Sequence, residues 1–220
     1  MSHLVFDSPK FKNWKRNLES SGITIEQIEV IGEISRNGTS LFTALLDCQL
    51  RTHEGITIPR CVVLRGDGAI AIPVLNCVED QTIYTLMVQQ RREVDGRIST
   101  EFPAGTVEPT MEEPLTVAVQ ELEEELGMVV LAEELQLLNP YPLKPDPSIL
   151  SAIYHYFYFE REVTQAFLNK MDGRETGCHE DHEYMRVKVQ KMSEVSQTNQ
   201  STFSLAGLKL LENKLGKTFK

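Results

Sequence analysis

Apolar and polar positions in the first part of the chain follow a helical period and then a strand-like one. Phe11, Trp14 and Leu18 recur at spacings of three and four, which predicts a short amphipathic helix over 9–21. Apolar runs bounded by turn residues then predict strands, which lie at 23–34, 40–51, 56–65, 69–78 and 82–90. A turn at 79–81 joins the last two runs, so 74–90 is predicted to be a hairpin.

The rest of the chain alternates between helical and strand-like patterns. Leu115, Leu122 and Leu126 lie at helical spacing within 112–126, and Gly127 directly after them is a typical helix end. The following patterns predict an aromatic strand, a short helix, a second strand and a final helix begun by Ser201 or Thr202, at 150–160, 163–171, 184–189 and 203–215. This order of elements favours an α+β sandwich with a mixed sheet.

The N-terminal segments stand apart in this scheme. A small helix and antiparallel strands fill residues 1–66, whereas 67–220 holds the hairpin and both long helices. No linker rich in Pro, Gly or Ser demands two full domains. We expect the strands before Ala69 to form a small sheet of their own, which could pair with a partner chain in a homodimer.

Composition and charge exclude several classes of protein. The 220 residues include 22 Lys and Arg against 32 Asp and Glu, a formal net charge of −10, whereas a general nucleic-acid binder needs an excess of cations. No apolar run approaches the roughly 20 residues that span a bilayer, and the start shows no secretory signal. Four scattered cysteines lack zinc-ligand spacing. We expect a cytoplasmic protein with neither nucleic-acid nor membrane partners.

Three glutamates gather on one side of the helix predicted over 112–126. Glu121 and Glu125 are four residues apart and stack on one face, with Glu124 one turn from Glu121. Like charges at these spacings destabilise a helix by about 0.2–0.5 kcal/mol per pair, and the helix dipole disfavours anions near the C-terminus. A solvated acidic face is the plain alternative. A bound cation would offset both penalties, and clustered oxygen ligands suit Mg²⁺ or Mn²⁺.

The loop ahead of this helix strengthens the metal hypothesis. Pro103-Ala104-Gly105 is predicted to be a tight turn whose backbone oxygens can approach a metal. Together with the run Glu121-Leu-Glu-Glu-Glu-Leu-Gly-Met128, it resembles the box of the Nudix hydrolases, which act on nucleoside diphosphates linked to another group. Two departures are visible. Gln120 stands where the family has arginine, so a supporting salt bridge is expected to be lost, and Gly105 and Glu112 are one residue further apart than usual.

Other parts of the chain resemble ADP-ribose and ADP-sugar pyrophosphatases, and the plant-type ADP-sugar diphosphatases most closely. The shared features are the opening helix with Phe11, Trp14 and Leu18, the run Gln90-Arg91-Arg92, Glu101-Phe-Pro-Ala-Gly105 and Gly173-Arg-Glu-Thr-Gly177. The proline-rich segment 140–148 departs from these relatives because it lacks their loop glutamates, which leaves the sugar specificity open. The resemblance implies a Nudix α/β/α sandwich.

The resemblance also implies roles for single residues. It makes Glu121 and Glu125 the principal Mg²⁺ ligands, with Glu124 on the same metal cluster as a ligand and catalytic group and the Ala104 carbonyl completing the set. A general base or further ligand is expected from the acidic stretch 178–183, where Glu180 is the first choice and Glu183 the second. Substrate contacts are expected from Arg92 as the diphosphate clamp and from three further residues, Arg65, Gln90 and Glu101.

The activity implied is the Mg²⁺-dependent splitting of a nucleoside diphosphate sugar into a nucleoside monophosphate and a sugar phosphate, with Mn²⁺ as a possible substitute. ADP-ribose and ADP-glucose are the favoured substrates, and GDP-mannose and UDP-glucose the alternatives. A Nudix-like domain that binds a nucleotide without cutting it, as a regulator, also stays open, because Gln120 replaces the box arginine. An acidic-faced structural protein does not explain Pro103-Ala104-Gly105 at that position.

Overall fold

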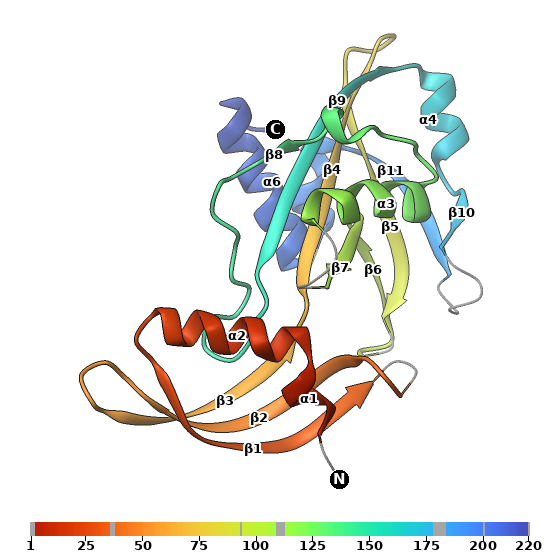
Figure 1. The fold of residues 1–220 in the computed structure, drawn as a ribbon. Helices are drawn as coiled ribbons and strands as arrows, with labels where there is room; N and C mark the ends of the chain where they lie inside the picture. The colour runs from red at the N-terminus through yellow and green to blue at the C-terminus, as the bar shows by residue number, and fades with distance from the viewer. Residues whose placement is uncertain are drawn as a thin grey trace. The chain divides into compact units, whose positions relative to one another are not determined.

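The computed structural model describes residues 3–35, 38–92, 94–108, 113–177, 184–199 and 201–219 (Figure 1). The chain divides into two units that interleave along the sequence. The first unit consists of Met1–Gly68, Thr106–Glu112 and Leu143–Tyr154, and the second of Ala69–Gly105, Glu113–Pro142 and His155–Lys220.

The first unit is built on the antiparallel sheet β1-β2-β3. Its elements are α1 (Leu4–Asp7), α2 (Pro9–Ser20), β1 (Thr24–Ser35), β2 (Leu41–Arg51) and β3 (Thr57–Arg65). In the central strand, Leu46 pairs with Val30 on one side and Val62 on the other, so the three side chains share one face. Phe11 and Trp14 of α2 pack against this face and close a small core.

A buried lysine ties α2 to the segment Thr106–Glu112 of the same unit. The Lys10 ammonium donates to the Leu41 carbonyl at 2.8 Å and to the Glu108 carboxylate at 2.6 Å. Lys10 is 4% exposed, and a buried charge of this kind is tolerated when it is paired and hydrogen-bonded. The ion pair therefore anchors the chain shortly after β7.

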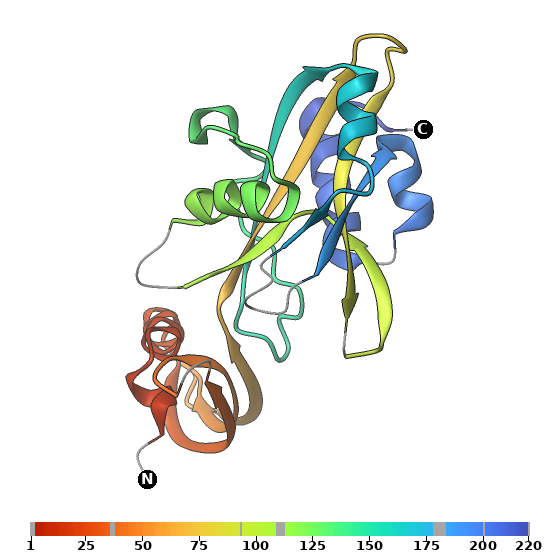
Figure 2. The same cartoon turned by 90° about the vertical axis from the view of Figure 1, so that its right-hand side faces the viewer.

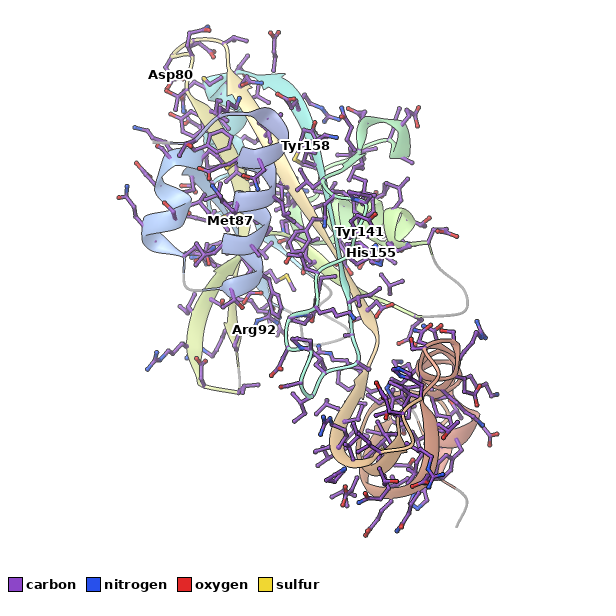
Figure 3. All side chains as sticks on the ribbon, turned by 90° about the vertical axis from the view of Figure 1, so that its left-hand side faces the viewer. Asp80, Met87, Arg92, Tyr141, His155 and Tyr158 are labelled. Carbon is purple, nitrogen blue, oxygen red and sulfur yellow. The ribbon has the colours of Figure 1, made fainter. Side chains whose placement is uncertain are left out.

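The second unit contains most of the larger sheet, whose strands follow the order β10-β11-β5-β4-β9-β8, with β6 paired to β5 and β7 to β4. The strand bounds are β4 (Asp67–Cys77), β5 (Ile83–Arg92), β6 (Arg97–Glu101), β7 (Ala104–Val107), β8 (Gln136–Leu137), β9 (Tyr154–Val163), β10 (Glu175–Thr176) and β11 (Met185–Lys191). β4 and β5 form a hairpin, with Asp80 in its turn and Arg92 at the opposite end of β5 (Figure 3).

Helices cover both faces of this sheet. The helical segments are α3 (Pro114–Leu126), η1 (Ala132–Glu134), α4 (Gln165–Met171), η3 (Met192–Glu194), α5 (Val195–Thr198) and α6 (Thr202–Leu215). α3 and α6 lie on opposite sides of the sheet, which makes the second unit a helix–sheet–helix sandwich (Figures 1 and 2). The predicted α+β sandwich is thereby confirmed. Within the described part of the chain, no helix has the length and apolar character needed to cross a membrane.

Most predicted elements are present with shifted ends. The aromatic strand expected over 150–160 begins only at Tyr154, because the amide of Leu150 donates to the Asp146 carbonyl at 2.9 Å and closes a turn there. The prediction of a tight turn at Pro103-Ala104-Gly105 is wrong. Ala104 begins β7, which pairs with β4, and the Pro103 carbonyl accepts a hydrogen bond from the Ala71 amide at 3.0 Å.

Candidate metal and diphosphate site

The acidic helix α3 has the ends that its sequence predicts. Pro114 occupies the first turn, where its missing N–H is not needed. Gly127 follows the helix in the left-handed conformation with φ 65°, and its N–H donates to the Glu123 carbonyl at 2.8 Å. Leu122 and Leu126 are fully buried, and α3 packs against β5, β10 and β11. This burial fixes which side of the helix faces away from the sheet.

Glu125 is the glutamate that the fold buries. Glu125 is only 8% exposed, and its Oε2 accepts a hydrogen bond from the Ala104 amide at 3.0 Å. A buried carboxylate needs compensating donors or a cation. The carboxylate of Glu125 is therefore held against the first residue of β7.

Glu121 lies one turn earlier and reaches the next residue of β7. A Cβ placed on Gly105 would overlap Oε1 of Glu121 and lie 2.6 Å from its Cγ and Cδ. Real Cβ atoms do not approach heavy atoms this closely, so the position of Glu121 requires a glycine at 105. The two carboxylates four residues apart on α3 thus converge on the consecutive residues Ala104 and Gly105.

The donors assembled here are of the kind that a hard divalent cation prefers. The two carboxylates offer oxygen only, and Mg²⁺ commonly uses one or two carboxylates while it keeps several waters. Glu124 is exposed on the same helix. Over the described residues, no three His, Cys, Asp or Glu side chains gather into a metal-binding group. The pair Glu121 and Glu125 is the part of the expected cluster that the described chain brings together.

The sheet face under α3 carries two of the expected substrate-binding residues, both on β5. Gln90 pairs with Met185, which pairs with Thr176, and the Thr176 hydroxyl donates to the Glu125 carbonyl of α3 at 2.6 Å. Paired residues of antiparallel strands share a face, so Gln90 belongs to the α3 side. Arg92, two residues further along β5, lies on the same face by strand alternation.

Arg92 and Glu101 are paired with each other. The guanidinium Nη2 lies 2.7 Å from Oε2 of Glu101, and the side chains are 46% and 19% exposed. The Ser99 hydroxyl also donates to the Glu101 carboxylate, which fixes that carboxylate from a second direction. Arg92 therefore has a defined orientation while nearly half of its side chain stays exposed.

The remaining predicted residues belong to the first unit or lie outside the described residues. Arg65 ends β3 in the first unit, where its guanidinium lies 5.6 Å from the centre of the Phe42 ring and its amide donates to the Ser151 hydroxyl at 3.2 Å. Glu180 and Glu183 belong to the segment 178–183, which the description does not include.

Sequence reasoning missed the residues that donate hydrogen bonds to the C-terminal end of α3. Thr176 donates to the carbonyl of Glu125, and the guanidinium of Arg174 donates to the carbonyl of Gly127 at 3.4 Å. In the sequence, the stretch 173–177 is distinguished only by its resemblance to the plant-type ADP-sugar diphosphatases. Its polar residues gave no sign of their partner, because the contact joins segments about fifty residues apart.

The family of this protein follows from a comparison with known domains. A family model of the NUDIX domain matches residues 65–204, more than half of the chain. The chain therefore belongs to the Nudix family, as its sequence predicts.

Two comparisons extend this result. Nudix hydrolase 14, chloroplastic, from Arabidopsis thaliana is 28% identical over 199 residues, an alignment that covers 84% of this chain but only 64% of the relative. A solved crystal structure described as an ADP compounds hydrolase matches with a TM-score of 0.59 and 16% identity, covering 88% of this chain and 94% of that one. The second likeness concerns the fold.

Proposed function

We propose that the chain hydrolyses the pyrophosphate bond of a nucleoside diphosphate sugar in a reaction that depends on Mg²⁺, for which Mn²⁺ can substitute. The observation that carries the proposal is the convergence of Glu121 and Glu125 on Ala104 and Gly105. Water adds to one phosphorus, the bond from that phosphorus to the bridging oxygen breaks, and a nucleoside monophosphate and a sugar phosphate leave.

The residues that would hold the cation are Glu121 and Glu125, with Glu124 as the third acidic group and the Ala104 carbonyl beside them. When bound, the cation supplies Lewis-acid chemistry, because it neutralises charge on the diphosphate and lowers the pKa of water. The hydrogen bond from the Ala104 amide to Glu125 keeps one carboxylate in a fixed orientation before any ligand arrives. Such preorganisation lowers the cost of binding.

Arg92 is the proposed diphosphate clamp. Guanidinium groups grip phosphate oxygens in a bidentate fashion, and the Glu101 carboxylate holds Arg92 ready for this contact. Gln90 adds an amide on the same sheet face. Arg65 is proposed as a further substrate contact on the ground of the sequence resemblance.

The general base is proposed to come from the acidic stretch 178–183. Glu180→Gln should depress turnover more than Glu183→Gln when both variants are assayed under identical Mg²⁺ and substrate concentrations. The reverse order would reassign the base to Glu183.

An adenine nucleotide is favoured as the substrate. The solved structure with the matching fold is described as an ADP compounds hydrolase, and the sequence resembles ADP-ribose and ADP-sugar pyrophosphatases in several segments. ADP-ribose and ADP-glucose are therefore proposed ahead of GDP-mannose and UDP-glucose.

A substrate panel tests the proposal. The protein is incubated with ADP-ribose, ADP-glucose, GDP-mannose and UDP-glucose in the presence of Mg²⁺, and the nucleoside monophosphate is quantified by chromatography. AMP and the matching sugar phosphate are expected in equal amounts from the two adenine compounds. Binding of these compounds without any product would instead support a nucleotide-binding regulator, the alternative raised by the exposed Gln120 at the arginine position of the box.

The N-terminal region 1–66 is proposed to mediate a homodimer, with 67–220 as the hydrolase domain and a cytoplasmic location. Apolar side chains of the first unit support the dimer, because Ile31 and Ile34 of β1 are 54% and 60% exposed. Light scattering coupled to size exclusion measures the mass directly. A mass twice that of the 25.0 kDa chain is expected, and a monomer would contradict this proposal.

A further inference from the structure

One short segment of the chain, Arg174–Gly177, donates hydrogen bonds to the C-terminal end of α3. The Thr176 hydroxyl donates to the Glu125 carbonyl at 2.6 Å, the Gly177 amide to the Glu124 carbonyl at 3.4 Å and the Arg174 guanidinium to the Gly127 carbonyl at 3.4 Å. The last carbonyls of a helix have no partner within the helix. This segment therefore supplies donors at the turn that carries the acidic residues.

The close approach of Arg174 depends on Gly127. A Cβ at Gly127 would lie 2.5 Å from Cζ of Arg174, and the φ of +65° already disfavours any other residue. Cations near a helix C-terminus are favourable, whereas the glutamates on that turn are not. The positive charge of Arg174 therefore lies at the end of α3 where the helix dipole and the glutamates both contribute negative charge.

Glu125 is held at two points by different parts of the chain. Thr176 fixes its backbone carbonyl, and the Ala104 amide fixes its side-chain Oε2. The hydrogen bond from Thr176 is short and comes from β10, a strand paired with β11 in the same sheet. Movement of the Glu125 backbone would therefore require β10 to move as well.

We propose that Thr176 is a positioning residue that holds the last turn of α3 so that the carboxylate of Glu125 stays aligned for a divalent cation. The inference rests on the proposed function, since it assigns Thr176 a role in that same site. Outer hydrogen-bond partners of metal ligands change metal affinity by about 10–100-fold when they are removed. Thr176 acts through the backbone of Glu125 and does not itself touch substrate.

The test compares Thr176→Val, which keeps the shape of the side chain and removes the donor, with Thr176→Ser, which keeps the donor. Mn²⁺ binding is measured by electron paramagnetic resonance in the absence of substrate, alongside the melting temperature. Thr176→Val is expected to weaken Mn²⁺ binding about 10-fold, and Thr176→Ser to bind close to wild type.

Thr198→Val serves as the matched control, because the Thr198 hydroxyl also donates to a helical carbonyl, that of Glu194, at 3.0 Å. It should lower the melting temperature by a similar amount and leave Mn²⁺ binding unchanged. In a Glu125→Gln background, Thr176→Val should have no further effect on Mn²⁺ binding, because the residue through which it acts has lost its charge.

Unaltered Mn²⁺ affinity in Thr176→Val would overturn the proposal, as would an equal loss in Thr198→Val. The Mn²⁺ titration also separates this inference from the proposed function. Wild-type protein that binds Mn²⁺ through Glu125 but hydrolyses no nucleotide sugar would defeat the function and leave the role of Thr176 in holding Glu125 intact.

Discussion

At the scale of single residues, the site depends on which of the glutamates Glu121, Glu124 and Glu125 the fold buries. The spacing of Glu121, Glu124 and Glu125 predicts that they lie near one another, and this follows from helical geometry alone. The spacing does not show that Glu125 is buried against Ala104 while Glu124 is exposed. That difference is set by the sheet under α3, which lies elsewhere in the sequence.

Glu125→Gln tests the role of the buried carboxylate. The amide oxygen can still accept from the Ala104 amide, so the melting temperature should change by about 4 °C or less. The loss of the charge should lower turnover by about 10²–10³-fold, as removal of one electrostatic group from an active site does. Steady-state kinetics at saturating Mg²⁺ measure the effect, with the exposed Glu123→Gln as the control on the same helix. Equal rates for both variants would remove Glu125 from the site.

Gly105→Ala tests the convergence of strand and helix. The added methyl group would displace Glu121, whose Cγ and Cδ would lie 2.6 Å away. A displacement of this size is expected to lower turnover by about 100-fold. Gly32→Ala is the control, because a Cβ there meets nothing within 4 Å. Full activity of Gly105→Ala would show that Glu121 need not lie over Gly105.

At the scale of secondary-structure elements, most of the longer segments could be predicted, whereas the short strands β6 and β10 could not. β4, β5, α3 and α6 carry enough apolar residues in one period to be recognised. β6 contains Ile98 as its one apolar residue, and β10 has only two residues. Their pairing with β5 and β11 comes from the sheet, and it sets the positions of Glu101 and Thr176.

An ion pair joins η1, shortly after α3, to β9. The side chain of Arg161 donates to Glu134 at 2.6 Å, and the Leu131 amide donates to the same carboxylate. The hydrogen bond from Arg161 is the main cause that lowers the pKa of Glu134 below 4.5. A carboxyl whose pKa is lowered by folding stabilises the protein above its unfolded pKa, and loses this contribution as the pH falls through the folded value.

Glu134→Gln should therefore lower the melting temperature at neutral pH, and its difference from wild type should shrink as the pH falls below 4.5. Thermal unfolding followed by circular dichroism across this pH range measures the difference. Glu133→Gln, on the exposed neighbour, is the control. A difference that is independent of pH would mean that the Glu134 charge contributes nothing to stability.

At the scale of the whole molecule, sequence reasoning could distinguish an N-terminal sheet from the sandwich. It could not predict that later segments of the chain return to the first unit. The segments Thr106–Glu112 and Leu143–Tyr154 belong to the first unit although both are flanked by elements of the second. The ion pair between the buried Lys10 and Glu108 joins residues ninety-eight positions apart. Such a contact leaves no periodic signal, since an isolated lysine and glutamate are usually exposed.

Glu121 and Glu125 are proposed to bind the divalent cation on which hydrolysis depends. The most direct measurement strips the wild type and the double variant Glu121→Gln/Glu125→Gln of metal with a chelator, returns Mg²⁺ and follows AMP formation from ADP-ribose. Wild type is expected to be inactive without metal and to recover on addition of Mg²⁺, whereas the double variant should stay inactive at every Mg²⁺ concentration. AMP formation by the double variant at the wild-type rate, or wild-type activity that survives chelation, would contradict the proposal.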